Sequence, residues 1–109
     1  MAYLAKVTKI MIAAFTSGSF LNVNTDNQEI QELANGIIGG DGIAAVGDDY
    51  LVSSWHGEVY HVDQNGSTTK LLDTKDAKIN AADIDYSQSK NLLLVPTFFG
   101  NKVVAYRLD

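Results

Sequence analysis

Three stretches of this sequence follow one plan, and their spacing constrains the fold more than any other feature. Each has an apolar strand with an aromatic residue at its end, a turn that contains glycine, and a strand of alternating polar and apolar residues. The stretches are Met11–Val23, Leu51–Val62 and Leu93–Leu108. The aromatic residues at the strand ends are Phe15, Trp55 and Phe98. The plan recurs about every 40 residues, a period typical of a β-propeller blade.

The segment from Asp41 to Asp63 shows how the strands must connect. It contains three short apolar runs, Gly42–Val46, Tyr50–Trp55 and Glu58–Val62, separated by tight turns. Strands this close in sequence can pair only as an antiparallel meander, because parallel pairing needs a long crossover.

Further strands are predicted on both sides of this meander. Gln28–Leu33 is polar and reads as an edge strand, with a short helix as the alternative. Pro96 lies inside an apolar run, which a sheet tolerates at a bulge or a strand end. The remaining predicted strands are Ala2–Phe15 (one strand, two strands hinged near Thr8, or a helix without an N-cap), Phe20–Asn24, Ser67–Leu72, Ala81–Tyr86, Asn91–Phe98 and Lys102–Leu108.

These strands predict an all-β fold built from β-propeller blades, each a four-stranded antiparallel meander. The blade portions are about 2–34, 41–73 and 81–109, within one partial propeller domain over residues 1–109. Gly42–Val46 and Ala81–Tyr86 are the expected innermost strands. The polar strands 28–33 and 67–72 are the expected outermost ones. The chain would supply about two and a half to three blades.

Such a partial ring has a consequence for partners. Propellers typically close with about four to eight blades, and an open arc would expose two apolar blade faces. We therefore expect either a longer parent chain or a homo-oligomer, most simply a homodimer that closes a six-bladed ring. In that dimer, residues 2–7 of one copy could complete the last blade of the other.

Composition excludes several classes of partner. The balance of 46% hydrophobic and 19% charged residues is that of a globular domain. The net charge of −5, with scattered Lys and Arg, argues against a nucleic-acid partner. Without cysteine there is no disulfide and no thiolate metal site. Ile10–Phe15 is too short for a signal-peptide core or a membrane span, so we expect a soluble protein. The sequence does not identify its cellular compartment.

At DGIAAVGDDYLVSSWHGEVYHVDQNG (41–66) and AADIDYSQSKNLLLVPTFFGNKVVAYRL (81–108) the chain resembles the C-terminal blades of six-bladed propellers. The resemblance is to the senescence marker protein/gluconolactonase-like family and its NHL-repeat relatives. Members that are lactonases bind a divalent cation at the axis through a Glu, Asn residues and an Asp. Asp41, in Asp41-Gly42-Ile43, matches that Asp. The corresponding position of the next repeat is Ala82, with Asn80 two residues away, and the Glu belongs to a blade outside this sequence.

The candidate site residues each have a structural alternative. Asp41 is a candidate metal ligand for a cation such as Ca²⁺ or Zn²⁺, or it shapes a turn. A second group of residues, aromatic or imidazole, is a candidate ligand rim, or serves blade packing: Trp55, His56, Phe98 and Phe99.

Other polar residues give weaker signals. Asp48 and Asp49 read as solvated turn residues. His56 and His61 are not expected to share a partner. Ser53 and Ser54 lack the strand-to-helix elbow of a catalytic serine.

Two functions follow as expectations. The first is a non-catalytic propeller module for assembly or ligand binding, with no cofactor. The alternative, implied by the resemblance, is a metal-dependent lactone or ester hydrolase that is active only in a complete ring.

Overall fold

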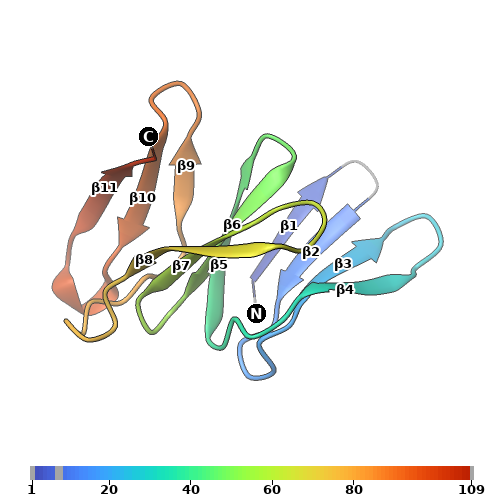
Figure 1. Cartoon of the computed structure of the whole chain (residues 1–109), viewed down its shortest axis with the longest axis horizontal. Coiled ribbons are helices and arrows are strands. Elements are labelled where there is room, and N and C mark those ends of the chain that lie inside the picture. Colours follow the sequence, from blue (N-terminus) through green and yellow to red (C-terminus); the bar gives the residue numbers. More distant parts are fainter. Residues whose placement is uncertain (1, 7–8, 109) are drawn as a thin grey trace.

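The computed structural model of the chain describes residues 2–6 and 9–108, and there the strands form three antiparallel sheets (Figure 1). The first sheet comprises β1 (Ala2–Lys6), β2 (Lys9–Ala13), β3 (Phe20–Asn24) and β4 (Ile30–Ala34). The second comprises β5 (Gly40–Val46), β6 (Asp49–Ser54), β7 (Glu58–Val62) and β8 (Thr68–Asp73). The third comprises β9 (Asp85–Ser87), β10 (Leu92–Pro96) and β11 (Val103–Arg107).

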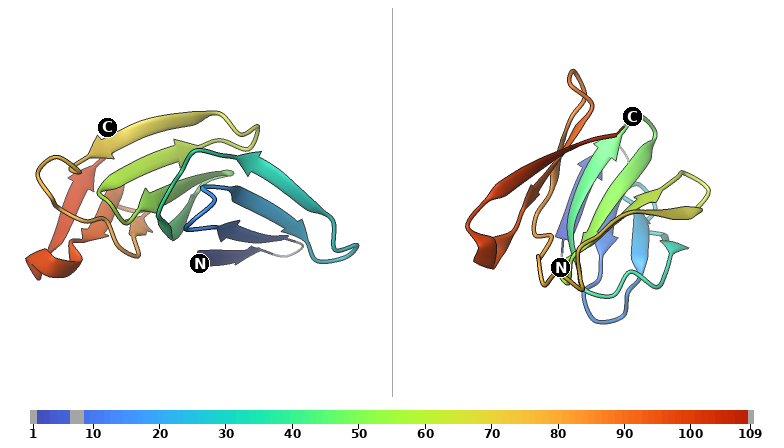
Figure 2. Two further views of the ribbon diagram at one scale, coloured as in Figure 1. Left: turned by 90° about the horizontal axis from the view of Figure 1, so that it is seen from below. Right: turned by 60° about the vertical axis from the view of Figure 1, so that its left-hand side comes forward.

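The three sheets are propeller blades stacked side by side in an arc. Within each sheet the strands pair in chain order, as a meander does. The first strands of successive sheets lie against each other, β1 against β5 and β5 against β9, so they form the inner edge of the arc. The sheets fan outward from this edge (Figures 1 and 2). The all-β partial propeller expected from the repeats is therefore confirmed.

The hydrophobic core consists of two clusters, one in each space between neighbouring blades. The first joins the first and second sheets through residues such as Met11, Phe20 and Val52. The second joins the second and third sheets through residues such as Leu51 and Leu93. These side chains are fully buried. Burying each one contributes about 1.5–3 kcal/mol, so the blades hold each other in place through apolar side chains of both faces.

Side chains of the turn residues close the outer hairpins. The carboxylate of Asp63 accepts hydrogen bonds from the N–H groups of Asn65 and Ser67, at 2.9 and 3.0 Å. The side-chain oxygen of Asn24 accepts from Asp26 at the equivalent turn of the first blade. Gly66 has φ +89°, which the Asn65-Gly66 pair predicts. Asx turns thus connect the third and fourth strands in both blades.

The structure corrects three expectations about strands. Residues 2–6 pair with β2 of their own chain, so they complete the first blade and not a blade of another copy. The expected strand Ala81–Tyr86 is reduced to β9. Asn91–Phe98 ends earlier, at Pro96, which confirms that the proline occupies a strand end. The predicted hinge near Thr8 lies outside the described residues.

The shortening of the 81–86 strand has a specific cause. The N–H of Ala82 donates to the carbonyl of Pro96, at 3.0 Å, while its own carbonyl accepts from the Ser53 hydroxyl, at 2.8 Å. Ala81 and Ile84 are buried in the second core cluster. This segment is therefore bound to the second and third sheets at once, and it joins the ladder only from Asp85.

Gln28–Leu33 also forms a strand and not a helix, shifted to β4 at the outer edge of the first sheet. Along the described residues, no helix has the length and apolar character required to cross a bilayer.

Candidate ligand-binding rim

Five ring-bearing side chains meet at one end of the blades, and we call this group the aromatic rim: Phe15, Trp55, His56, Phe98 and Phe99. They lie in the turns that follow β2, β6 and β10, the second strand of each blade. Because the three blades repeat one path, these turns lie at the same end of the arc, which is why residues far apart in sequence are neighbours.

The rings form a continuous row across the three blades. Ring centroids are 6.1 Å apart between Phe15 and His56, and 6.0 Å apart between His56 and Trp55. Trp55 then contacts Phe98 at 5.7 Å and Phe99 at 6.0 Å. The two phenylalanines are 4.7 Å apart and nearly perpendicular. These edge-to-face contacts each contribute about 0.5–1.5 kcal/mol, so the rim is partly self-supporting.

The rim is also unusually open to solvent. The exposed fraction is 43% for Phe15, 60% for Phe98 and 75% for Phe99. A cluster of large apolar side chains on the surface is typical of a surface that binds something. The rings therefore pack on each other, as the packing interpretation expects, and the phenylalanines also stay exposed, so a ligand rim remains a prediction.

The turn after β10 holds Phe98 in a strained backbone conformation. Phe98 has φ +60°, a left-handed backbone that a bulky residue rarely adopts, and Phe98–Gly100 form a single 3-10 turn, η1. Buried Thr97 fixes this turn, because its N–H donates to the carbonyl of Lys102 and its hydroxyl accepts from the N–H of Lys102. Such strain persists only where surrounding bonds impose it.

The position of Trp55 is set by the two segments beside it. Its N–H donates to the carbonyl of Gly39 at 2.7 Å, and its carbonyl accepts from the side-chain amide of Asn80 at 2.8 Å. Gly39 must be glycine here, because a Cβ at its φ of +81° would lie 2.8 Å from the His56 ring. The Trp55 backbone is therefore fixed from the loop that enters the second blade and from the loop that leads to the third.

The structure brings all four predicted rim residues together and adds Phe15 to them. Phe15 follows the second strand of the first blade, as Trp55 and Phe98 follow theirs, so the repeat itself contained the signal for it. What the repeat did not reveal was that the three turns approach closely enough for ring contacts.

The predicted metal ligand, Asp41, lies at the inner edge of the arc, near Asp83 of the next blade. Burial raises the pKa of the Asp41 carboxyl above its usual value, and the negative charge of Asp83 raises it further. Across the described residues, no three Asp, Glu, His or Cys side chains are grouped so as to hold a metal ion. Asp41 and Asp83 thus fit a cation only if another blade adds ligands.

The remaining polar candidates have structural partners. Ser53 and Ser54 are fully buried, and their hydroxyls donate to the carbonyls of Ala82 and Ile38. His61 pairs with Asp49, with 3.1 Å between Nε2 and Oδ2, so the expectation that Asp49 is simply solvated is wrong. His56 contacts Phe15 and Trp55 instead, which confirms that the two histidines have no common partner.

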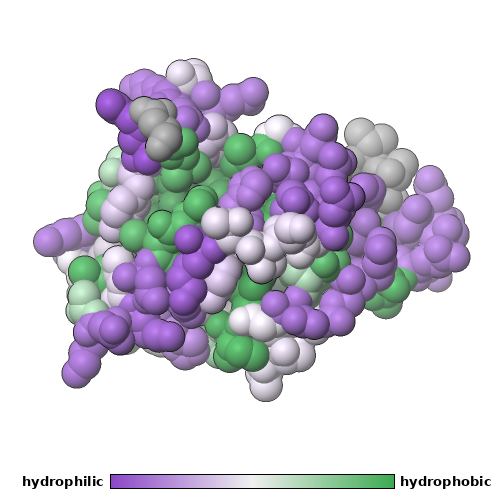
Figure 3. All heavy atoms as spheres, in the orientation of Figure 1, coloured by the Kyte–Doolittle hydropathy of each residue, from purple (hydrophilic) through white to green (hydrophobic). Residues whose placement is uncertain are grey.

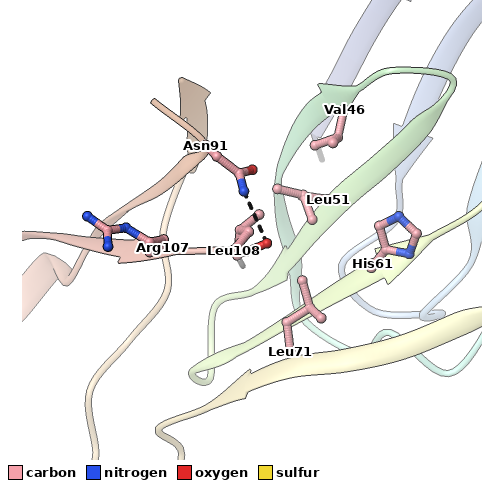
Figure 4. Close-up of a pocket in the computed structure, with 7 residues that line it drawn as sticks. All are labelled: Val46, Leu51, His61, Leu71, Asn91, Arg107 and Leu108. Atoms are coloured by element: carbon pink, nitrogen blue, oxygen red, sulfur yellow. Dashed lines mark hydrogen bonds between the residues drawn. The ribbon is translucent and has the colours of Figure 1, made fainter. Parts of the chain in front are cut away.

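A wedge-shaped cavity of about 420 Å³ opens between the second and third blades (Figure 4). Val46, Leu51 and Leu71 form one wall, and Leu108 lies opposite them. The Asn91 amide donates to the Leu108 carbonyl at 3.1 Å, which holds the end of the third blade across this opening. In Figure 3 apolar residues gather between these two sheets. The cavity is continuous with the core and lacks a grouping of reactive side chains.

No protein-family model matches this chain, and no curated protein matches it. The resemblance to gluconolactonase-like propellers therefore stays a prediction.

Proposed function

We propose that this chain is a non-catalytic propeller module, whose function is to assemble into a closed ring and to bind a ligand at its aromatic rim. One observation carries this proposal: over residues 2–6 and 9–108, each terminal blade has one sheet face without a neighbouring blade. In the interior of the arc the equivalent faces bury the two core clusters. The terminal faces have the same alternation of apolar residues and lack the covering sheet.

The first blade exposes the side of β2 and β3 that points away from the second blade. Register places Ile10 opposite Val23, and Ile12 opposite Leu21, on this face. Ile30 of β4 pairs with Val23 and is 68% exposed. These side chains form an aliphatic surface of the kind that would bury a neighbouring blade.

The third blade exposes a matching surface at the other end of the arc. Leu94 lies opposite Ala105, and Pro96 opposite Val103, on the face away from the second blade. Val103 is 67% exposed. A twofold dimer can place the last blade of each copy on the first blade of the other, which covers both surfaces twice and closes the ring.

The test is the mass of the protein in solution. We expect light scattering to give twice the 11.8 kDa of one chain. Ile30→Asp and Val103→Asp, on the two terminal faces, should each produce monomers, because every contact in the dimer uses one face of each kind. Thr69→Asp is the matched control, since Thr69 is exposed on β8 of the middle blade and lies outside both terminal faces and the cavity. A folded wild-type protein that stays at 11.8 kDa at all concentrations would rule the assembly out.

A second candidate is metal-dependent hydrolysis of lactones or esters in the closed ring. The pairing of Asp41 with Asp83 at the inner edge favours it, since ring closure would add the inner edges of further blades. Calorimetric titration of Ca²⁺ and Zn²⁺ tests it. Binding heat that disappears in Asp41→Asn, together with lactone turnover, would replace the non-catalytic proposal. No heat and no turnover would eliminate the hydrolase.

A further inference from the structure

The third blade ends in a strand whose outer edge is open. Along the part of the chain that the structure describes, β11 pairs with β10 alone, whereas its equivalents β3 and β7 each pair on both sides. Figures 1 and 2 show β11 at the outside of the arc with no strand beyond it. The first two blades thus show what normally occupies this position: an antiparallel fourth strand, β4 or β8.

Backbone N–H and C=O groups of β11 point toward the open edge, where a further strand could pair with them. The Leu108 N–H donates to the Asn91 carbonyl, and the Thr97 N–H donates to the Lys102 carbonyl. Hydrogen-bonded and non-hydrogen-bonded pairs alternate in an antiparallel ladder. The N–H and C=O groups of Val103 and Ala105 therefore point away from β10, toward the open edge.

The side chains of β11 also suit an inner strand better than an edge. Natural edge strands carry charges that discourage pairing with other chains. The true outer strands do so here, with Glu32 on β4, and Lys70 and Asp73 on β8. Residues 103–106 of β11 carry no charge and no proline, and the one charged residue of the strand is Arg107 at its end. This edge therefore lacks the usual protection.

A groove of about 200 Å³ beside β11 indicates the charge of the missing strand. Val104 and Tyr106 line it from β11, and Lys78, Ile79 and Lys102 line it from the neighbouring loops. No carboxylate lines it, and among the described residues neither lysine makes an ion pair.

The second blade has the same kind of ion pair with the charges exchanged: its fourth strand carries the lysine and its third strand the carboxylate. Lys70 of its fourth strand reaches Glu58, at the start of the third strand, with 2.7 Å between the charged atoms.

We propose that the β11 edge binds an extended acidic peptide segment as an antiparallel fourth strand. Backbone hydrogen bonds at Val103 and Ala105 would supply affinity, as in other strand-addition complexes. A carboxylate of the segment would enter the groove between Lys78 and Lys102. The proposal does not rest on ring assembly, because the edge of the third sheet and the blade faces are different surfaces.

The chain itself provides a suitable probe. A synthetic peptide with the sequence of residues 27–35 is the fourth strand of the first blade and contains Glu29 and Glu32. These two positions are three residues apart, so one of them faces the groove in either orientation of the pleat. Two matched controls are the same peptide with both glutamates changed to lysine, and the same peptide with Ile30→Pro.

The experiment is an NMR titration of the full ¹⁵N-labelled chain with each peptide. We expect saturable shifts of the Val103 and Ala105 amide signals with the acidic peptide, and at least tenfold weaker binding of the lysine and proline peptides. Lys102→Glu should reverse the preference between the acidic and lysine peptides. A repeat in Ile30→Asp separates this binding from ring assembly.

Three results would overturn the proposal. One is the absence of any shift at Val103 and Ala105. Another is equal binding of acidic and lysine peptides. The third is a shift at these two amides with protein concentration in Ile30→Asp, where ring assembly is blocked, because that result would identify a second copy as the strand that pairs with β11.

Discussion

At the scale of single residues, the close packing of the second and third blades at the inner edge requires a glycine at position 42. Gly42 of β5 lies so close to the next blade that a Cβ there would be 2.5 Å from the Ile84 backbone nitrogen and 2.9 Å from the Asp83 Cα. Its N–H also donates to the Ser53 hydroxyl at 2.8 Å. Backbone from two blades therefore meets at a point where even a methyl group does not fit.

Gly42→Ala should destabilise the protein by about 1–3 kcal/mol, the usual cost of overpacking a rigid site. Urea unfolding followed by circular dichroism measures this change. Gly47→Ala is the control, because Gly47 has φ +59° but open space around it. It should cost only about 1–2 kcal/mol, the strain of a left-handed residue. A smaller loss for Gly42→Ala than for Gly47→Ala would contradict the close approach of the blades.

At the scale of elements, an ion-pair network joins the outer two strands of the second blade. Lys70 of β8 contacts Glu58 at 2.7 Å and Asp73 at 3.3 Å, and the Tyr60 hydroxyl donates to Glu58 at 3.0 Å. The hydrogen bond from Lys70 is the main reason that the pKa of Glu58 lies below its usual value. The network ties a polar outer strand to the rest of its sheet.

Lys70→Met should lower the free energy of unfolding at pH 7, and this loss should disappear in acid. A carboxyl whose pKa is lowered by folding stabilises the protein above its unfolded-state pKa, near 4.5, and loses that effect as the pH falls through the folded value. Urea unfolding of both proteins at pH 7 and pH 3 tests this. Lys90→Met, at an exposed turn position, should change little at either pH. A Lys70→Met deficit that persists at pH 3 would mean that the lysine acts through packing.

At the scale of the whole molecule, the proposed ring assembly predicts that stability depends on protein concentration. If copies close a ring, they bind only the folded chain, so assembly adds to stability by mass action. The thermal midpoint of the wild type should therefore rise with protein concentration. The midpoints of Ile30→Asp and Val103→Asp should not change over the same range. A concentration-independent wild-type midpoint would argue against assembly.

The repeat of strands and the place of Pro96 at a strand end could be predicted from the sequence, because both depend on local chemistry. Alternation of apolar residues, turn residues such as Asn65-Gly66, and the short spacing of the strands are sufficient to predict meanders of about 40 residues. For the same reason Trp55, His56, Phe98 and Phe99 could be chosen as candidate rim residues: they lie in the equivalent turns after β6 and β10.

Other features were decided only when the blades packed. From the sequence, residues 2–6 could pair in their own blade or in a blade of another copy. In the structure they pair with β2 of their own chain. Ala81–Tyr86 has strand-like residues, but the N–H and carbonyl of Ala82 bond to Pro96 and Ser53 and not to a ladder partner. The ring contacts of the rim and the approach of Asp83 to Asp41 likewise join different blades. Local sequence determined the strands and their turns, whereas contacts between distant segments, which no local pattern encodes, determined the surfaces on which function depends.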